Sequence, residues 1–305
     1  MGRRRPLLQE LGRLWRELTD DFRYAADEAR TEWRRGKWEM DHPGQKAVSD
    51  AEADEIIEWY QSLARPALML RPDDRIAATE APAQIGGPVW LAEGEQWPLD
   101  PDGKRLEFVA QLDFRRLPRL AGFPETGVLR FFVGRDELFG ANWDVPEQSG
   151  CRILWHPGPL SGGRLEPPLP LDPEEMSPFQ SESLRADGVA LAATETYDLP
   201  DADSFQVDAR LSQLGDRLGA SEVQDQIFEL SEERQGGHCV GGYPMFTQPD
   251  FRRAGYYDDY DVLLLGLTSD EAIMWGDVGE AMFLMRQADL DRRDFSRVIF
   301  YWDCY

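Results

Sequence analysis

Residues 85–114 read IGGPVWLAEGEQWPLDPDGKRLEFVAQLDF and contain the pattern on which the fold prediction depends. A Gly-Gly turn at 86–87 is followed by a stretch rich in Pro, Asp and Gly, and then by the apolar run at 108–114. Glycine supplies the backbone conformations of tight turns, and a short apolar run bounded by turn residues is typical of a buried strand. The stretch therefore predicts a turn, a long loop and a buried central strand.

A second stretch repeats these features in the same order. Gly242, in the turn Gly241-Gly242-Tyr243-Pro244, precedes Leu264 of the apolar run at 261–267 by 22 residues, and Gly87 precedes Ala110 by 23. In both places a glycine then opens another apolar run with a phenylalanine four positions on, Gly127 with Phe131 and Gly279 with Phe283. The alternative is a chance similarity of short strands, since Gly-Gly turns commonly precede buried strands in β-rich chains. We predict pseudo-repeats at about residues 84–135 and 238–287.

Further short apolar runs at 128–133, 152–155, 281–285 and 298–302 alternate with turn residues, and helices are expected at 50–64 and 222–233. Residues 157–178 are rich in Pro and Gly and are expected to form a surface connection. Neither pseudo-repeat is large enough to close and cover its own sheet. The expected fold is therefore α+β, with mostly antiparallel β-sheets from two pseudo-duplicated halves that share one core, N-terminal helices and a few peripheral helices.

The N-terminal region has a different pattern of apolar and charged residues. Apolar residues recur at helical spacing over residues 7–33, which predicts one amphipathic helix stopped by the turn at 42–44. Acidic residues dilute the arginines of its polar face, so packing on its own body or on a partner is favoured over a membrane surface. The residues expected to face a partner or a second copy are Leu11, Trp15, Leu18 and Phe22. We predict a helical extension at 1–45 and an α+β body at 46–305.

The charge of the chain limits its partners. The 305 residues carry a net charge of −24, yet residues 1–40 hold ten Lys/Arg and eight Asp/Glu, so the acidity belongs to the body. Such a field repels nucleic acid and anionic lipids and favours a basic protein partner, although acidity can also serve solubility alone. No apolar run approaches about 18 residues, so no membrane span is expected. Three widely spaced cysteines form no disulfide framework, and we predict a cytoplasmic location.

Several blocks resemble the YwqG-like family of bacterial proteins. They are the stretch 85–114, His238 followed by Gly242-Tyr243-Pro244, the segment Met274-Trp275-Gly276-Asp277 and the C-terminal block 294–305. The resemblance covers roughly residues 50–305 and leaves out the helix at 7–40. It implies a bacterial cytoplasmic protein, and it supplies no established activity. Members of that family tend to occur near toxin and immunity genes, which suggests a binding or protective role.

No recognisable catalytic, phosphate-binding or zinc-binding string occurs in the chain. If the two halves enclose a pocket, we expect His238, Trp275 and Asp277 to line it, with Gln111 and Trp97 opposite. The favoured interpretation of His238 is structural, as a hydrogen-bond partner of a turn or as a helix cap. The carboxylates at 258–277 have no EF-hand spacing and are expected to be solvated, so we predict no metal and no cofactor. Tryptophans near turns could build a cleft for a sugar or peptide: Trp90, Trp97, Trp143, Trp155 and Trp275.

These observations favour a non-enzymatic protein-binding module, an inhibitor or immunity-type partner of a bacterial effector. One alternative is an enzyme or small-ligand sensor with a pocket between the halves. Another is a scaffold that uses residues 7–33 for oligomerisation or docking. The sequence leaves open whether the protein has any catalytic activity.

Overall fold

The computed structural model describes residues 30–148, 150–232, 236–253 and 255–305, which fall into two compact units. Of the described residues, the first unit holds 30–58 and 210–226, and the second holds the rest. Leu11, Trp15, Leu18 and Phe22 lie outside the described residues, as does the predicted helix except for residues 30–33. Their role in binding and the boundary at residue 45 stay predictions.

The first unit is helical. Residues 30–41 form a helix that ends at the predicted turn, where the His42 ring stacks on Trp38. The unit also holds the first part of α2 (Asp50–Ser62) and of α5 (Ala220–Glu232), close to the helices predicted at 50–64 and 222–233. Arg217 donates to both carboxylate oxygens of Glu52 at 2.7 Å and to the carbonyls of Lys46 and Ala47. Within the described ranges, no helix combines the length and apolar character needed to cross a bilayer.

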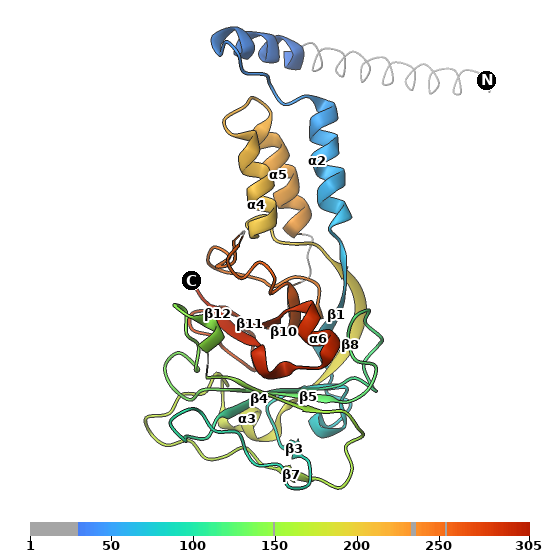
Figure 1. Cartoon of the computed structure of the whole chain (residues 1–305), viewed down its shortest axis with the longest axis vertical. Coiled ribbons are helices and arrows are strands. Elements are labelled where there is room, and N and C mark those ends of the chain that lie inside the picture. Colours follow the sequence, from blue (N-terminus) through green and yellow to red (C-terminus); the bar gives the residue numbers. More distant parts are fainter. Residues whose placement is uncertain (1–29, 149, 233–235, 254) are drawn as a thin grey trace, which may run out of the picture. The chain divides into compact units, whose positions relative to one another are not determined.

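The second unit is built on one curled antiparallel sheet of ten strands (Figure 1). In spatial order these are β12 (Ile299–Asp303), β11 (Glu280–Met285), β10 (Val262–Thr268), β9 (His238–Gly241), β1 (Arg65–Pro72), β8 (Val189–Asp198), β2 (Ala83–Ile85), β4 (Glu107–Asp113), β5 (Val128–Val133) and β6 (Arg152–His156). The second unit also contains a two-stranded sheet of β3 (Val89–Leu91) and β7 (Arg164–Glu166), the short helices α3 (Glu182–Asp187) and α6 (Gln287–Arg292), and the first five residues of α4 (Phe205–Leu211). The predicted α+β class is confirmed.

The strand order is the same from either edge of the sheet, so each strand of the first half (residues 65–156) has an equivalent in the second half (residues 189–303). The registers agree as well. Between β4 and β5 the pairing shifts across Val109, and between β10 and β11 it shifts across Leu264. The two central strands exchange places, because β1 pairs with β9 of the second half and β8 pairs with β2 of the first. The halves are thus intertwined, while an origin by gene duplication stays a prediction.

Glycines at equivalent positions permit equivalent close approaches of the backbone. Gly87 and Gly242, in the two Gly-Gly turns, have φ values of 75° and 69°, a region in which side chains are strained. A Cβ atom on Gly127 would overlap the carbonyl oxygen of His156, and a Cβ on Gly279 would overlap that of Asp303. Because β6 and β12 are equivalent strands, both halves need glycine here for the same reason.

The inner faces of the two halves form one hydrophobic core. Phe131 of β5 and Phe283 of β11 lie with their ring centroids 4.8 Å apart, and both rings are fully buried. Trp155 of β6 packs against Phe295 in the connection between β11 and β12, and Trp302 of β12 contacts Phe139 in the connection between β5 and β6. Each half therefore fixes a loop of the other, as expected for a shared interior.

Candidate functional site

His238, the first predicted site residue, is buried in β9 and bonds a turn. Its Nδ1 accepts the Thr268 backbone N–H at 3.2 Å, so the proton lies on Nε2, which donates to Asp270 Oδ2 at 3.2 Å. Partial burial alone would raise the pKa of Asp270, but hydrogen bonds from His238, Ala272 and Ile273 outweigh it and hold the pKa below its ordinary value. This geometry agrees with the structural interpretation of His238.

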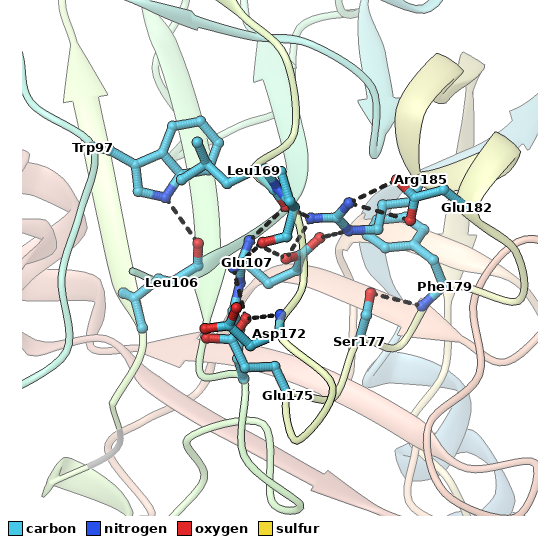
Figure 2. Close-up of polar contacts among 12 residues, drawn as sticks. Trp97, Leu106, Glu107, Leu169, Asp172, Glu175, Ser177, Phe179, Glu182 and Arg185 are labelled. Atoms are coloured by element: carbon cyan, nitrogen blue, oxygen red, sulfur yellow. Dashed lines mark hydrogen bonds and ion pairs between the residues drawn. The ribbon is translucent and has the colours of Figure 1, made fainter. Parts of the chain in front are cut away.

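The other four predicted residues lie in different surroundings. Trp275 has no exposed surface and packs in the shared core, and Gln111 is buried on β4 opposite Arg130 of β5. Trp97 is half-buried and donates its indole N–H to the Leu106 carbonyl at 2.8 Å (Figure 2). Asp277 is exposed. None of the cavities considered below is lined by His238, Trp275, Asp277, Gln111 or Trp97.

An open cavity of about 720 Å³, here called the acidic cavity, lies at the connection between β5 and β6. Its lining comes from the turn at 100–102, from 134, 136–138 and 140–144, and from Gly150. Five of these residues are acidic: Asp100, Asp102, Asp136, Glu137 and Asp144. Among the residues that the structure describes, none of the five forms an ion pair, whereas buried carboxylates such as Glu107, Asp113 and Asp250 do.

Backbone hydrogen bonds fix two of these carboxylates. Asp136 Oδ1 accepts the N–H groups of Leu138 and Gly140, both at 2.9 Å, and Asp100 Oδ1 accepts those of Asp102 and Lys104. Short polar side chains at turn positions commonly bond the backbone in this way. In both residues Oδ1 is used by the turn, which leaves Oδ2 for a donor from outside.

An aromatic side chain borders the acidic cavity. Trp143 is 47% exposed, and its Nε1 donates to the Trp302 carbonyl at 2.9 Å. In return Trp302 Nε1 donates to the Leu138 carbonyl at 2.8 Å, and Phe139 between them is buried in the core. These contacts hold the loop on β12 and leave part of the Trp143 surface open to solvent.

The chemistry of the acidic cavity suits a cation. Five carboxylates without a cationic partner repel one another, and a bound ammonium or guanidinium group relieves that repulsion. An exposed indole beside carboxylates can hold the same cation over its face. The lining contains no histidine or cysteine that would act as a nucleophile or proton shuttle. The arrangement is suited to binding.

A second cavity, of about 680 Å³, is lined by residues 201–209 and 246–253. Its buried Arg252 donates to both oxygens of buried Asp250 and lies between the rings of Phe205 and Phe246. These charges neutralise each other within the protein, so they contribute to the stability of the fold. The lining also contains the acids Asp201, Asp203 and Asp208 together with Arg253, whereas every charged residue in the lining of the acidic cavity is acidic.

Of the residues around the acidic cavity, only Trp143 was predicted from the sequence as a possible cleft residue, and the five acids were missed. A signal is visible in retrospect, since Asp100, Asp102 and Asp144 stand beside Gly, Pro or Trp, and Asp136 and Glu137 lie between Gly134 and Gly140. Nothing in the chain order indicates that the turn at 100–102 meets the loop at 134–144. That contact depends on the pairing of β4 with β5.

Within the described ranges, no group of three His, Cys, Asp or Glu side chains is placed to hold a metal ion. A family model described as a domain of unknown function, DUF1963, matches residues 83–304, which is more than half of the chain. The comparison with curated proteins finds no match. The narrower YwqG-like resemblance stays a prediction.

Proposed function

Because the chain belongs to the DUF1963 family, whose function is unknown, we propose from the site itself that the protein is a non-enzymatic binding module. Its acidic cavity takes up a lysine- or arginine-rich segment of a partner protein. The observation that carries this proposal is the set of five carboxylates without an ion pair around one cavity, beside the half-exposed Trp143.

Electrostatic attraction supports this proposal both at long range and at short range. At long range, the net charge of −24 speeds the approach of a basic partner. At short range, the fixed carboxylates of Asp100 and Asp136 and the Trp143 ring give a cationic side chain a defined place. An inhibitor or immunity-type role is consistent with both, since such proteins must capture an effector quickly.

The test uses an eight-residue lysine peptide with blocked ends as the probe. Its affinity is measured by calorimetry, and its position by the fluorescence change that the Trp143→Phe variant should remove. We expect binding to weaken as salt rises, and to weaken about tenfold or more in a variant that carries Asp136→Asn, Glu137→Gln and Asp144→Asn.

A matched control separates the cavity from the overall field. The variant with Asp74→Asn, Glu93→Gln and Asp216→Asn removes the same charge from exposed positions outside the acidic cavity. We expect it to bind the peptide nearly as well as the wild type at physiological salt. Equal losses in both triple variants, or no binding by the wild type, would refute the proposal.

A further inference from the structure

A smaller cavity of about 330 Å³, here called the cationic cavity, shares two chain segments with the acidic cavity. It is lined by Lys104, Arg105 and Arg135, together with residues 169–170, 172 and 175 of the connection before α3. Asp100, Pro101 and Asp102 line the acidic cavity, while Lys104 and Arg105, in the same turn, line the cationic one. Likewise Arg135 lies between Gly134 and Asp136 in the chain but belongs to the other cavity.

Arg135 is buried and retains an unused donor. Its two terminal nitrogens bond the Glu107 and Glu175 carboxylates and the carbonyls of Leu169 and Pro170, at 2.8 to 3.1 Å. Its Nε is buried and has no hydrogen-bond partner. A buried donor without an acceptor costs about 1–3 kcal/mol, so an incoming acceptor at this place would be stabilised.

The carboxylates nearest to Arg135 are already engaged. Glu107 contacts Arg135. It also contacts Arg185, which in turn contacts Glu182 (Figure 2). Glu175 Oε2 accepts from Arg135 and from the Asp172 N–H. Burial raises the pKa of the Glu107 carboxyl, and the two guanidinium groups oppose that rise. These groups therefore form a closed network, in which the carboxylates of Glu107, Glu175 and Glu182 are paired with arginines.

The rim carries surplus positive charge. The side chains of Lys104 and Arg105 are exposed and form no hydrogen bond or ion pair within the part of the chain that the structure describes. The lining contains two carboxylates, Asp172 and Glu175, and Glu175 is paired with Arg135, so Asp172 alone opposes the two rim cations. In a chain with a net charge of −24, such a surplus beside a buried arginine is unexpected unless it serves a ligand.

We propose that the cationic cavity binds a carboxylate of the same segment that occupies the acidic cavity. This inference rests on the proposed function and makes it more specific. Consecutive Cα atoms are about 3.8 Å apart, so the backbones of the two linings meet at residues 135 and 136 and again at residues 102 and 104, and the proposal is that one short segment contacts both. The preferred segment carries Lys or Arg and, a few positions away, Asp, Glu or a C-terminal carboxylate.

The experiment compares two end-blocked peptides, Lys-Lys-Gly-Lys-Lys-Glu and Lys-Lys-Gly-Lys-Lys-Gln. The glutamate peptide has the lower positive charge, so attraction to the acidic field alone favours the glutamine peptide. We expect the opposite order, with the glutamate peptide about tenfold tighter, because a carboxylate gains charge-assisted hydrogen bonds at the cationic cavity. The Lys104→Gln/Arg105→Gln variant should abolish that preference.

A control variant, Lys37→Gln/Lys46→Gln, removes the same charge at exposed positions outside both cavities and should keep the preference. If the wild type binds both peptides but prefers glutamine, this inference fails and the proposed function stands. If neither peptide binds, both fail. Inorganic phosphate is tested as a separate probe: saturable binding that depends on Lys104 and Arg105, without a preference for the glutamate peptide, would assign the cavity to a free oxyanion instead.

Discussion

Two connections occupy equivalent places in the two halves, one between β5 and β6 and the other between β11 and β12. They differ in whether their acidic residues are paired with arginines. In the second, at 286–298, buried Asp289 contacts both Arg292 and Arg297, and Arg286 contacts Asp259 at 2.5 Å. In the first, at 134–151, Asp136, Glu137 and Asp144 have no ion pair among the described residues. The buried carboxylate of the second connection is thus neutralised, while these three acids of the first are not, although Glu147 of the first connection contacts Arg286 of the second.

This difference shows whether the fold itself requires unpaired carboxylates in such a connection. Both connections join the same pair of equivalent strands, and both are fixed by an aromatic contact with the opposite half. The fold can therefore accommodate a neutralised loop at this place. Unpaired carboxylates in the first connection are not demanded by packing, which is why we assign them to binding.

The largest expected effect on stability tests whether the two halves are structurally equivalent at Gly127 and Gly279. Replacing Gly127 or Gly279 by alanine places a Cβ against a backbone carbonyl of β6 or β12, which cannot move cheaply. We expect each variant to lose about 3 kcal/mol of stability in urea unfolding, with the two values similar. Alanine at Gly94, a turn glycine with open space around it, serves as a control and should lose about 1 kcal/mol from its positive φ alone. A large loss at only one of the two equivalent sites would break the comparison.

The next effect concerns the connection between β11 and β12, in which Asp289 is buried. Removing both arginines in an Arg292→Ala/Arg297→Ala variant leaves the Asp289 carboxylate buried without a cation, and we expect a loss of about 2 kcal/mol. Adding Asp289→Asn to that variant removes the uncompensated charge and should recover part of the loss. Thermal and urea unfolding measure both. An unchanged stability in the double variant would mean that these ion pairs do not stabilise the connection.

Sequence patterns identified the outer strands of both halves because they are apolar and bounded by turns. The predicted runs at 108–114, 128–133, 261–267 and 281–285 coincide with β4, β5, β10 and β11 to within a residue. The two central strands were missed. β1 reads RPALMLRP, with proline near both ends, and β8 reads VALAATETYD, whose Ala and Glu residues have low strand propensity. Their place in the sheet depends on pairing with each other and with both halves.

The site was harder to predict than the fold for a related reason. The sequence suggested pocket residues near turn motifs, but Trp275 is fully buried, where it packs against Phe139 and Phe300. The cavity carboxylates come from two segments separated by about 30 residues, and only the β4–β5 pairing brings them together. Net charge predicted the character of the surface and could not locate it.

A smaller effect comes from a polar contact that only the second half contains. His238 stands where the first half has Ala83, since these residues pair with Leu70 and Leu191 at equivalent positions. The pKa of Asp270 lies below its ordinary 3.8 in the folded state, so its carboxylate stabilises the fold above about pH 4, and this contribution is lost as the pH falls through the lower, folded-state pKa.

An Asp270→Asn variant should therefore be about 1 kcal/mol less stable than the wild type at pH 7. The difference should shrink as the pH falls below 4, where the wild-type carboxylate becomes protonated too. Urea unfolding between pH 2.5 and pH 7 measures it. A difference that stays constant over this range would show that the charge of Asp270 contributes nothing.

The smallest effect has opposite signs in the two connections. Neutralising Glu137 or Asp144 relieves repulsion in the acidic cavity, so we expect Glu137→Gln and Asp144→Asn each to raise stability by a few tenths of a kcal/mol at low salt, and the gain to vanish at high salt. In the other connection, the N–H and hydroxyl of Ser296 bond Asp294 and hold its pKa below its ordinary value, so Asp294→Asn should lower stability. Thermal unfolding at two salt concentrations measures all three variants. If the cavity variants also lost stability, the carboxylates of the first connection would be serving the fold, and the argument that they are kept for a cationic partner would lose its basis.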